Sequence, residues 1–100
     1  MTAHVYILRC GDGSDYVGST RASLEQRVAE HNAGTFCGFT KPRRPVALVY
    51  QQHFDRIEDA IAAERRLKGW SRAKKEALMR GEFDLLRTLS KRRTKKRKGD

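Results

Sequence analysis

The stretch HVYILRCGDGSDYVGST, residues 4–20, decides how this fold begins. Two short runs rich in β-branched and aromatic residues, 3–9 and 15–19, flank a polar segment. Asp12 and Gly13 lie in that segment, and glycine tolerates the positive φ that a tight hairpin turn requires. The two runs therefore predict antiparallel strands that form one hairpin.

The segment after the hairpin carries the signals of a helix and then of a long loop. Ser23 and Gln26 form an S-x-x-Q capping box, in which each side chain can satisfy a free backbone amide at a helix start. The helix is expected to run to about Asn32 and to end at Gly34, since glycine suits a helix end. Residues 33–45, AGTFCGFTKPRRP, are rich in glycine and proline and predict a loop.

A third strand and two further helices follow this loop. Residues 46–52, VALVYQQ, predict the strand. The next helix is expected to be capped by Asp55 and to end at Gly69, and the one after it to be capped by Ser71 and to end at Gly81. The order ββαβαα predicts an α+β domain, a small three-stranded antiparallel sheet flanked by helices.

Length and charge indicate one folded domain with a basic end. The 100 residues suffice for one small domain, and the apolar residues cluster before residue 90. We therefore expect a domain over residues 1–89, closed by a short helical segment at 82–89, and a disordered tail over 90–100. The net charge is +10, and the tail is strongly basic. This favours nucleic acid as the partner over a purely solubilising tail or a membrane surface.

The cysteines and the apolar runs exclude several classes of protein. Cys10 and Cys37 are the only cysteines, and the sequence has no CxxC and no histidine pair at zinc spacing. Free thiols in a reducing compartment are expected, without a structural zinc. No apolar run approaches the roughly 20 residues of a membrane span. The start MTAHVYIL shows no secretory signal, so we expect a cytoplasmic protein.

A carboxylate interrupts the apolar face of the predicted second helix. Successive helical residues turn by about 100°, which places Ile57, Ala60, Ile61 and Leu67 on one arc that should face the sheet. Glu64 falls in the middle of this arc. Burying an unpaired carboxylate is costly, so Glu64 needs a partner. It is either a rim residue paired with a lysine or arginine, or a metal ligand.

The first helix shows the same pattern with two basic side chains. Leu24 and Val28 mark its inner face, and Arg27 and His31 lie on that side four residues apart. Taken singly, an arginine that reaches to solvent and a hydrogen-bonded core histidine are sufficient explanations. Taken together with the two hairpin tyrosines and the glutamate of the second helix, they favour a functional site.

These side chains suit the cleavage of a phosphodiester bond. A metal held by a carboxylate acts as a Lewis acid and lowers the pKa of bound water. An arginine fork matches two phosphate oxygens, and a tyrosine or histidine can relay a proton. Magnesium needs only one carboxylate when water and substrate oxygens complete its shell.

The same residues resemble the GIY-YIG nucleases. The tripeptide HVY, residues 4–6, aligns with G-I-Y, and YVG, residues 16–18, aligns with Y-I-G. Arg27 and His31 match the R-x-x-x-H of the family's first helix, and Glu64 matches the glutamate of a later helix. In particular, the stretches HNAGTFCGFTKPRRPVALVY and AAERRLKGWSRAKKEALMRG resemble the small standalone bacterial proteins called UPF0213. Larger relatives include homing endonucleases, restriction enzymes and DNA repair nucleases.

The resemblance, which covers about residues 3–81, implies a metal-dependent endonuclease that cuts DNA with low sequence specificity. Tyr6 and Tyr16 would share the site, and which of them deprotonates the attacking water stays open. Arg27 would contact the scissile phosphate, and His31 would assist proton transfer. Glu64 would hold one Mg2+ or Mn2+, and no small-molecule cofactor is implied.

The remaining expectations concern the partner. The side chains expected to contact nucleic acid are Lys41, Arg43, Arg44, Lys68 and Arg72. Phe36 and Phe39 lie in the same basic loop and either stack on unpaired bases or close the core. DNA is the expected partner, in branched, damaged or single-stranded form, with RNA left open and no membrane. A non-catalytic nucleic-acid-binding module and a basic adaptor are the alternatives.

Overall fold

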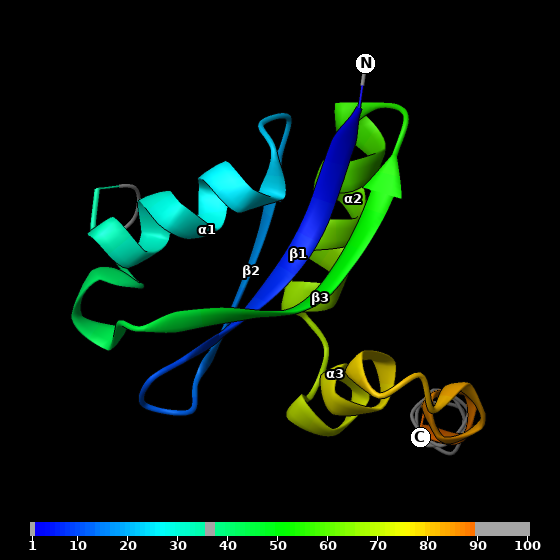
Figure 1. Cartoon of the computed structure of the whole chain (residues 1–100). Helices are drawn as coiled ribbons and strands as arrows, with labels where there is room; N and C mark the ends of the chain where they lie inside the picture. Colours follow the sequence, from blue (N-terminus) through cyan, green and yellow to red (C-terminus); the bar gives the residue numbers. More distant parts are fainter. Residues whose placement is uncertain (1, 36–37, 90–100) are drawn as a thin grey trace. The chain divides into compact units, whose positions relative to one another are not determined.

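The computed structural model of the chain describes residues 2–35 and 38–89 (Figure 1). They fall into two compact units, Met1–Lys68 and Gly69–Asp100. The first unit contains an open antiparallel sheet of three strands, β1 (Ala3–Cys10), β2 (Asp15–Thr20) and β3 (Val46–Phe54), in the order β2-β1-β3. The predicted α+β class is thus confirmed. The basic tail over 90–100 lies outside the described residues.

The hairpin of β1 and β2 forms as its sequence predicts. Gly13 has a φ of 87°, and the backbone amide of Ser14 donates to the Asp12 carboxylate at 3.0 Å. Tyr6 pairs with Gly18 across the two strands. Because side chains alternate along a strand, Tyr6, Gly18 and Thr20 share one face of the sheet, and Ser19 lies on the other.

Helices cover both faces of this sheet. On the face of Tyr6 lies α1 (Leu24–Ala33), whose Leu24 and Val28 pack against the buried Tyr6 and Leu8. On the opposite face lies α2 (Ile57–Lys68), which contacts Ser19 of β2 through Glu64 (Figure 1). The central strand β1 is therefore buried from both sides.

The ends of α1 follow their local signals, with one difference. The Ser23 hydroxyl accepts a hydrogen bond from the Gln26 amide at 3.1 Å, and Gly34 ends the helix with a φ of 77°. The Gln26 side chain does not return to the helix start, as the capping box predicted, but contacts the Glu30 carboxylate at 3.4 Å. Only half of the capping box forms, because Glu30, four residues on, attracts the amide of Gln26.

The end of α1 is tied to the start of β3 by one side chain. The Asn32 amide nitrogen donates to the Val46 carbonyl at 3.1 Å, and the Val46 amide donates to the Asn32 amide oxygen at 2.7 Å. Between them the loop includes a short 3₁₀ helix, η1 (Lys41–Arg43), which the sequence did not predict. The strand β3 also runs two residues beyond its predicted end, to Phe54.

The buried arc of α2 differs from the prediction. The buried residues are Ala60, Ala63 and Leu67, whereas the side chain of Ile61 is 37% exposed. Ile61 lies about 100° around the helix from Ala60, at the edge of the arc. The centre of the arc therefore lies away from Glu64, which occupies its half-buried flank.

The second unit begins with α3 (Arg72–Met79). The Ser71 hydroxyl caps this helix by accepting from the Lys74 amide at 3.2 Å, as predicted. Gly81 follows with a φ of 72°, and residues 83–89 are helical. Among the described residues, no helix is long and apolar enough to cross a membrane. In the first unit, Cys10 is a buried free thiol, as expected, while Cys37 lies outside the described residues.

Candidate active site

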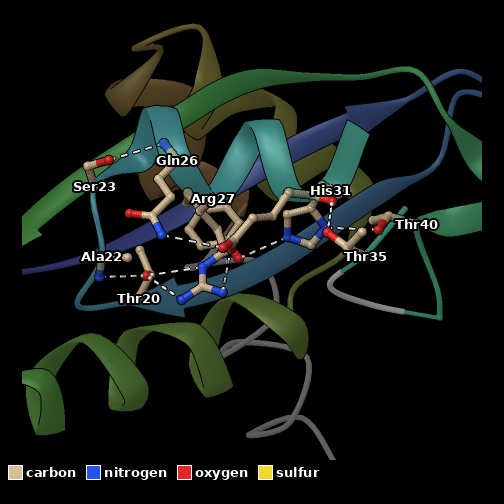
Figure 2. A network of polar contacts seen from close by, with 10 residues as sticks. Thr20, Ala22, Ser23, Gln26, Arg27, His31, Thr35 and Thr40 are labelled. Atoms are coloured by element: carbon tan, nitrogen blue, oxygen red, sulfur yellow. Dashed lines mark hydrogen bonds and ion pairs between the residues drawn. The ribbon is translucent and has the colours of Figure 1, made fainter. Parts of the chain in front are cut away.

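A buried chain of hydrogen bonds links β1, α1 and the loop before η1. The Tyr6 hydroxyl lies 3.2 Å from Nε2 of His31, and Nδ1 of His31 lies 2.8 Å from the Thr40 hydroxyl. All three side chains are buried. Figure 2 shows His31 pointing from α1 toward the sheet, with Thr40 on its far side. In the tautomer whose Nδ1–H donates to the Thr40 hydroxyl, Nε2 is the nitrogen that can accept a proton from Tyr6.

The environment of His31 keeps its imidazole neutral. Burial lowers the pKa of His31, the positive charge of Arg27 lowers it further, and the negative charge of Glu30 opposes them in part. The net effect lowers the pKa of His31 below its ordinary value of 6.5, so the uncharged ring is the main form at neutral pH. A neutral imidazole bonded to a phenol is a competent proton acceptor.

The second tyrosine and a glycine complete the aromatic part of the site. The Tyr16 ring centroid lies 5.0 Å from that of His31 and 6.3 Å from that of Tyr6. A Cβ atom on Gly18 would come within 2.6 Å of the Tyr6 hydroxyl oxygen. Only glycine at this position leaves the space that the hydroxyl occupies, which gives the glycine of the YVG tripeptide a physical reason.

Arg27 is fixed beside the edge strand β2. Its Nε and Nη2 atoms donate to the Thr20 hydroxyl at 3.2 and 3.0 Å, and Nη1 donates to Glu30 at 3.0 Å (Figure 2). Thr20 also accepts the Ala22 amide at 2.9 Å. The guanidinium is therefore held in one orientation on the Tyr6 face of the sheet.

Glu64 reaches the same edge of the sheet from the opposite face. The Ser19 hydroxyl donates to its Oε1 at 2.6 Å, and Nζ of Lys68 lies 2.7 Å from Oε2. Partial burial raises the pKa of Glu64, but the bonds from Lys68 and Ser19 and the charges of Lys68 and Arg65 outweigh it, so the net shift is downward. The carboxylate is an anion at neutral pH.

The structure thus arranges the five predicted residues in two groups. Tyr6, Tyr16 and His31 contact one another, and Arg27 lies one helical turn from His31 on α1. Glu64 is linked to this group through β2, since its partner Ser19 is the neighbour of Thr20, the partner of Arg27. The edge strand β2 therefore separates the Glu64 carboxylate from the two tyrosines and His31.

The donor set at Glu64 fits a hard divalent cation. One carboxylate and the Ser19 hydroxyl are oxygen donors, and Mg2+ and Mn2+ prefer oxygen and accept water and phosphate for the remaining positions. Within residues 2–35 and 38–89, no three His, Cys, Asp or Glu side chains gather as a metal cluster. A cation at Glu64 would take only these two oxygens from the described residues, and water or other oxygen ligands would have to complete its shell.

Two arginines of the predicted basic loop, Arg43 and Arg44, make contacts that stabilise the loop itself. The Arg43 guanidinium pairs with Asp12 at 3.2 Å and lies 4.1 Å from the centroid of the Phe39 ring, and Arg44 donates to the Lys41 carbonyl at 2.8 Å. Lys41 itself is exposed. The two arginines therefore hold the loop together while their side chains remain accessible.

The two phenylalanines of this loop, Phe36 and Phe39, were expected either to stack on unpaired bases or to close the core. The Phe39 ring is 40% exposed and lies 5.9 Å from the ring of Tyr16, so it covers the site without closing the core. Phe36 lies outside the described residues. Arg72 belongs to the second unit, where it is exposed and lies 3.7 Å from Glu76.

The sequence analysis did not identify four polar partners of the site. They are Ser19, Thr20, Glu30 and Thr40. Thr20 and Ser19 could have been placed by alternation from Gly18, since they continue the same strand on opposite faces. Thr40 could not, because its burial depends on how the loop folds over α1.

An open groove lies elsewhere on the same face of the sheet. It encloses about 840 Å³ between the start of α1 and strands β1 and β3, and its walls include His4, Leu24, Val28, Leu48 and Gln51. The tyrosines, Arg27 and His31 do not line this groove. This groove is therefore distinct from the group of Tyr6, Tyr16 and His31, of which Tyr6 and His31 are buried.

A small antiparallel sheet with tyrosines on two paired strands, and an arginine and histidine on the following helix, defines a GIY-YIG domain. The GIY-YIG catalytic domain profile matches residues 2–77, so the chain belongs to the GIY-YIG family, a family of endonucleases that act on nucleic acids. The predicted resemblance is confirmed.

Within this family the chain is similar to small standalone proteins. It is 47% identical to a UPF0213 protein of Halobacterium salinarum, over 75% of this chain and 96% of the relative. The solution NMR structure of a UPF0213 protein from Bacillus halodurans is 40% identical, with a TM-score of 0.50, and covers 78% of this chain and 82% of its own. That of a protein from E. faecalis is 36% identical, with a TM-score of 0.57, and covers 85% and 88%.

Proposed function

We propose that this chain is a divalent-metal-dependent endonuclease that hydrolyses phosphodiester bonds in DNA with low sequence specificity. The observation that carries the proposal is the buried bond between Tyr6 and a neutral His31, one helical turn from the fixed guanidinium of Arg27. A protein that only binds nucleic acid has no use for a buried proton relay beside its phosphate site.

Tyr6 and His31 handle the proton in this proposal. As a water molecule attacks phosphorus, its proton passes to the Tyr6 oxygen, and the Tyr6 hydroxyl proton passes to Nε2 of His31. The bond from phosphorus to the leaving oxygen breaks, and solvent protonates the leaving oxygen. Thr40 keeps Nδ1 of the ring bonded throughout. Tyr16, in contact with His31, orients the water or takes over the role of Tyr6.

Arg27 and Glu64 handle the charge of the phosphate. The planar guanidinium of Arg27 matches two phosphate oxygens, and Thr20 and Glu30 fix its orientation. Glu64, with the Ser19 hydroxyl beside it, is the residue that would hold Mg2+ or Mn2+. When bound, such a cation supplies Lewis acidity toward the phosphate and a water of lowered pKa.

Low sequence specificity follows from how this chain would hold DNA. A net charge of +10 favours contacts to phosphates, which position a protein on DNA but do not read bases. The exposed basic side chains available for this are Lys41, Arg44, Lys68 and Arg72. Arg43 is half-buried and paired with Asp12, and its accessible part adds to this charge. RNA is a second candidate substrate, and the cytoplasm is the proposed compartment.

Nicking of supercoiled plasmid tests the proposal. The full chain is incubated with Mg2+ or Mn2+ and, in parallel, with EDTA, and Glu64→Gln and Tyr6→Phe are purified identically. We expect metal-dependent nicking that both substitutions strongly reduce. Equal nicking by the variants identifies a contaminant and contradicts the proposal.

Two further outcomes distinguish the alternatives. Binding without nicking of plasmid, branched and single-stranded DNA would establish a nucleic-acid-binding module instead. Deletion of residues 90–100 is expected to weaken DNA binding and make it less dependent on salt, while nicking persists. Loss of all function on this deletion would indicate an adaptor that acts through its tail.

A further inference from the structure

We propose that Lys68 is an exchangeable counter-ion that couples metal binding to nucleic acid binding. Without metal its ammonium neutralises Glu64, and it transfers to a substrate phosphate when a divalent cation takes the carboxylate. This inference rests on the proposed function, because it requires that Glu64 holds the metal.

The contacts of Glu64 divide its carboxylate into a fixed and an exchangeable side. Oε1 is held by the Ser19 hydroxyl, which belongs to the sheet. Oε2 lies 2.7 Å from Nζ of Lys68, the last residue of α2. The Lys68 side chain is 52% exposed against 19% for Glu64, so the lysine can leave while the carboxylate stays in place.

A divalent cation and the ammonium compete for this carboxylate. Both are attracted by its single negative charge, and they repel each other at contact distance. Lys68 must therefore move away before a cation can bind Oε2 without repulsion. Because the lysine of this pair is half exposed and follows Glu64 by four residues on one helix, water can replace its contact, and the loss of the pair is a modest barrier to this exchange.

The displaced ammonium is well placed for a phosphate. Lys68 is attached at the end of α2 through four rotatable carbons, so its head group can move several ångströms without moving the helix. A phosphate that draws Lys68 away leaves Glu64 with its full charge for the cation. The two binding events then favour each other, and by thermodynamic linkage the effect is the same in both directions.

The position of Lys68 sets it apart from its basic neighbours. Lys68 follows Glu64 by four residues on the same face of α2, which brings the two head groups into contact. Arg66 carries the same charge on the same helix, is exposed, and lies two residues from Glu64, about 200° around the helix. It is the matched control for a general effect of charge.

The first test is the affinity of the full chain for Mn2+ alone, without nucleic acid, measured by electron paramagnetic resonance of free Mn2+. The proteins are the wild type, Lys68→Gln, Arg66→Gln and Glu64→Gln. We expect Lys68→Gln to bind Mn2+ about fivefold more tightly, since a competing and repelling charge is lost. Arg66→Gln is expected to stay within about twofold of the wild type, because exposed charges are largely screened. Glu64→Gln is expected to lose the site.

The second test measures the same affinities with a phosphorothioate oligonucleotide that resists cleavage. We expect the oligonucleotide to tighten Mn2+ binding in the wild type and in Arg66→Gln, and to do so several-fold less in Lys68→Gln. Circular dichroism checks that each variant folds. Both tests read binding and need no turnover.

The outcomes separate this inference from the proposed function. If Lys68→Gln binds Mn2+ no more tightly than Arg66→Gln, or the oligonucleotide effect is unchanged, Lys68 is not the exchanging group and the inference is wrong. If Glu64→Gln still binds Mn2+ normally, the metal does not sit on Glu64, and the metal assignment of the proposed function fails as well.

Discussion

The two faces of the sheet hold their functional side chains in different ways. On the α1 face, Tyr6, His31 and Thr40 are buried and joined by hydrogen bonds between largely uncharged groups. On the α2 face, Glu64 sits at a half-buried rim and is joined to an exposed lysine by opposite charges. The same strand edge thus carries one rigid arrangement and one adjustable arrangement.

This difference indicates which part of the candidate site has a fixed geometry before any ligand binds. Leaving a buried polar group without its partner costs about 1–3 kcal/mol, so the Tyr6–His31–Thr40 chain keeps its geometry before substrate arrives. Lys68 and Glu64 are joined by one ion pair whose lysine is half exposed, so this pair can separate more readily, as the proposed exchange requires. Proton transfer needs fixed distances, whereas charge compensation tolerates exchange.

Replacing the buried hydroxyl is expected to have the largest effect on activity. Tyr6→Phe removes the group that receives the proton of the water, and we expect nicking to fall by about 10²–10⁴-fold. The free energy of unfolding should fall by only about 1 kcal/mol, since one buried hydrogen bond is lost. Plasmid nicking and urea denaturation measure the two effects.

Tyr16→Phe is the matched control, because it removes the hydroxyl of the neighbouring ring. A larger loss of nicking in Tyr16→Phe than in Tyr6→Phe would reverse the roles assigned to the two tyrosines.

A side chain at Gly18 is expected to have the second-largest effect, because it would displace Tyr6 on the α1 face of the sheet. In Gly18→Ala the new Cβ would lie 2.6 Å from the Tyr6 hydroxyl, so either the ring or the strand must shift. We expect a loss of about 1–3 kcal/mol of stability, as for other overpacked cores, together with a loss of nicking. Gly38→Ala is the control, since no atom of the described residues beyond its chain neighbours lies within 4 Å of its added Cβ. Similar stabilities for the two variants would show that the site is not tightly packed.

Thr40→Val tests whether the loop helps to hold the histidine. It removes the hydroxyl beside Nδ1 of His31, and we expect a loss of about 1–2 kcal/mol, because a buried ring nitrogen is left without its partner. Thr40→Ser should restore most of the stability and the nicking. Thr35→Val, at an exposed threonine near the end of the same helix, should change stability by less than about 0.5 kcal/mol. An equal effect of both valine variants would contradict the role of Thr40.

The smallest effect is expected in the pH dependence of stability. The folded state holds the pKa of His31 below its ordinary value of 6.5, so the unfolded chain takes up a proton first as the pH falls. The contribution of His31 to stability is therefore present above pH 6.5 and is lost as the pH falls from there through the folded pKa. Urea denaturation between pH 5 and 8 measures it.

His31→Gln should flatten this pH dependence, whereas a glutamine at the exposed His53 should preserve it. An NMR titration of His31 in the wild-type protein gives an independent reading. A midpoint for His31 above pH 6.5 would show that the ring is not kept neutral.

The sequence predicted the parts of this fold that depend on neighbours along the chain. The turn at Gly13, the cap at Ser23 and the helix end at Gly34 all follow from backbone preferences of single residues. These features need no knowledge of the rest of the molecule.

The parts that failed or were missed depend on packing between distant segments. Ile61 is apolar and near the buried arc, but the small Ala60 and Ala63 bring the helix close to the sheet and leave Ile61 outside. Thr40 lies nine residues from His31 in a glycine- and proline-rich loop, and no periodic pattern marks it. Glu64 was expected to pair with a lysine or arginine, or to bind a metal, and Lys68 is one of its partners.

The paired bonds between Asn32 and Val46 have a consequence for how the molecule folds. In a strand, successive backbone amides point to opposite edges, so Asn32 can grip Val46 but not its neighbour Ala47. If β3 shifts by one residue, both bonds to Asn32 are lost. Asn32, the neighbour of His31, is then no longer attached to the sheet. The side-chain amide of Asn32 thus stabilises only the correct register of β3. In a shifted register, the helix end that carries His31 would also lose its attachment to the sheet. The register of β3 and the position of His31 are therefore coupled through one side chain.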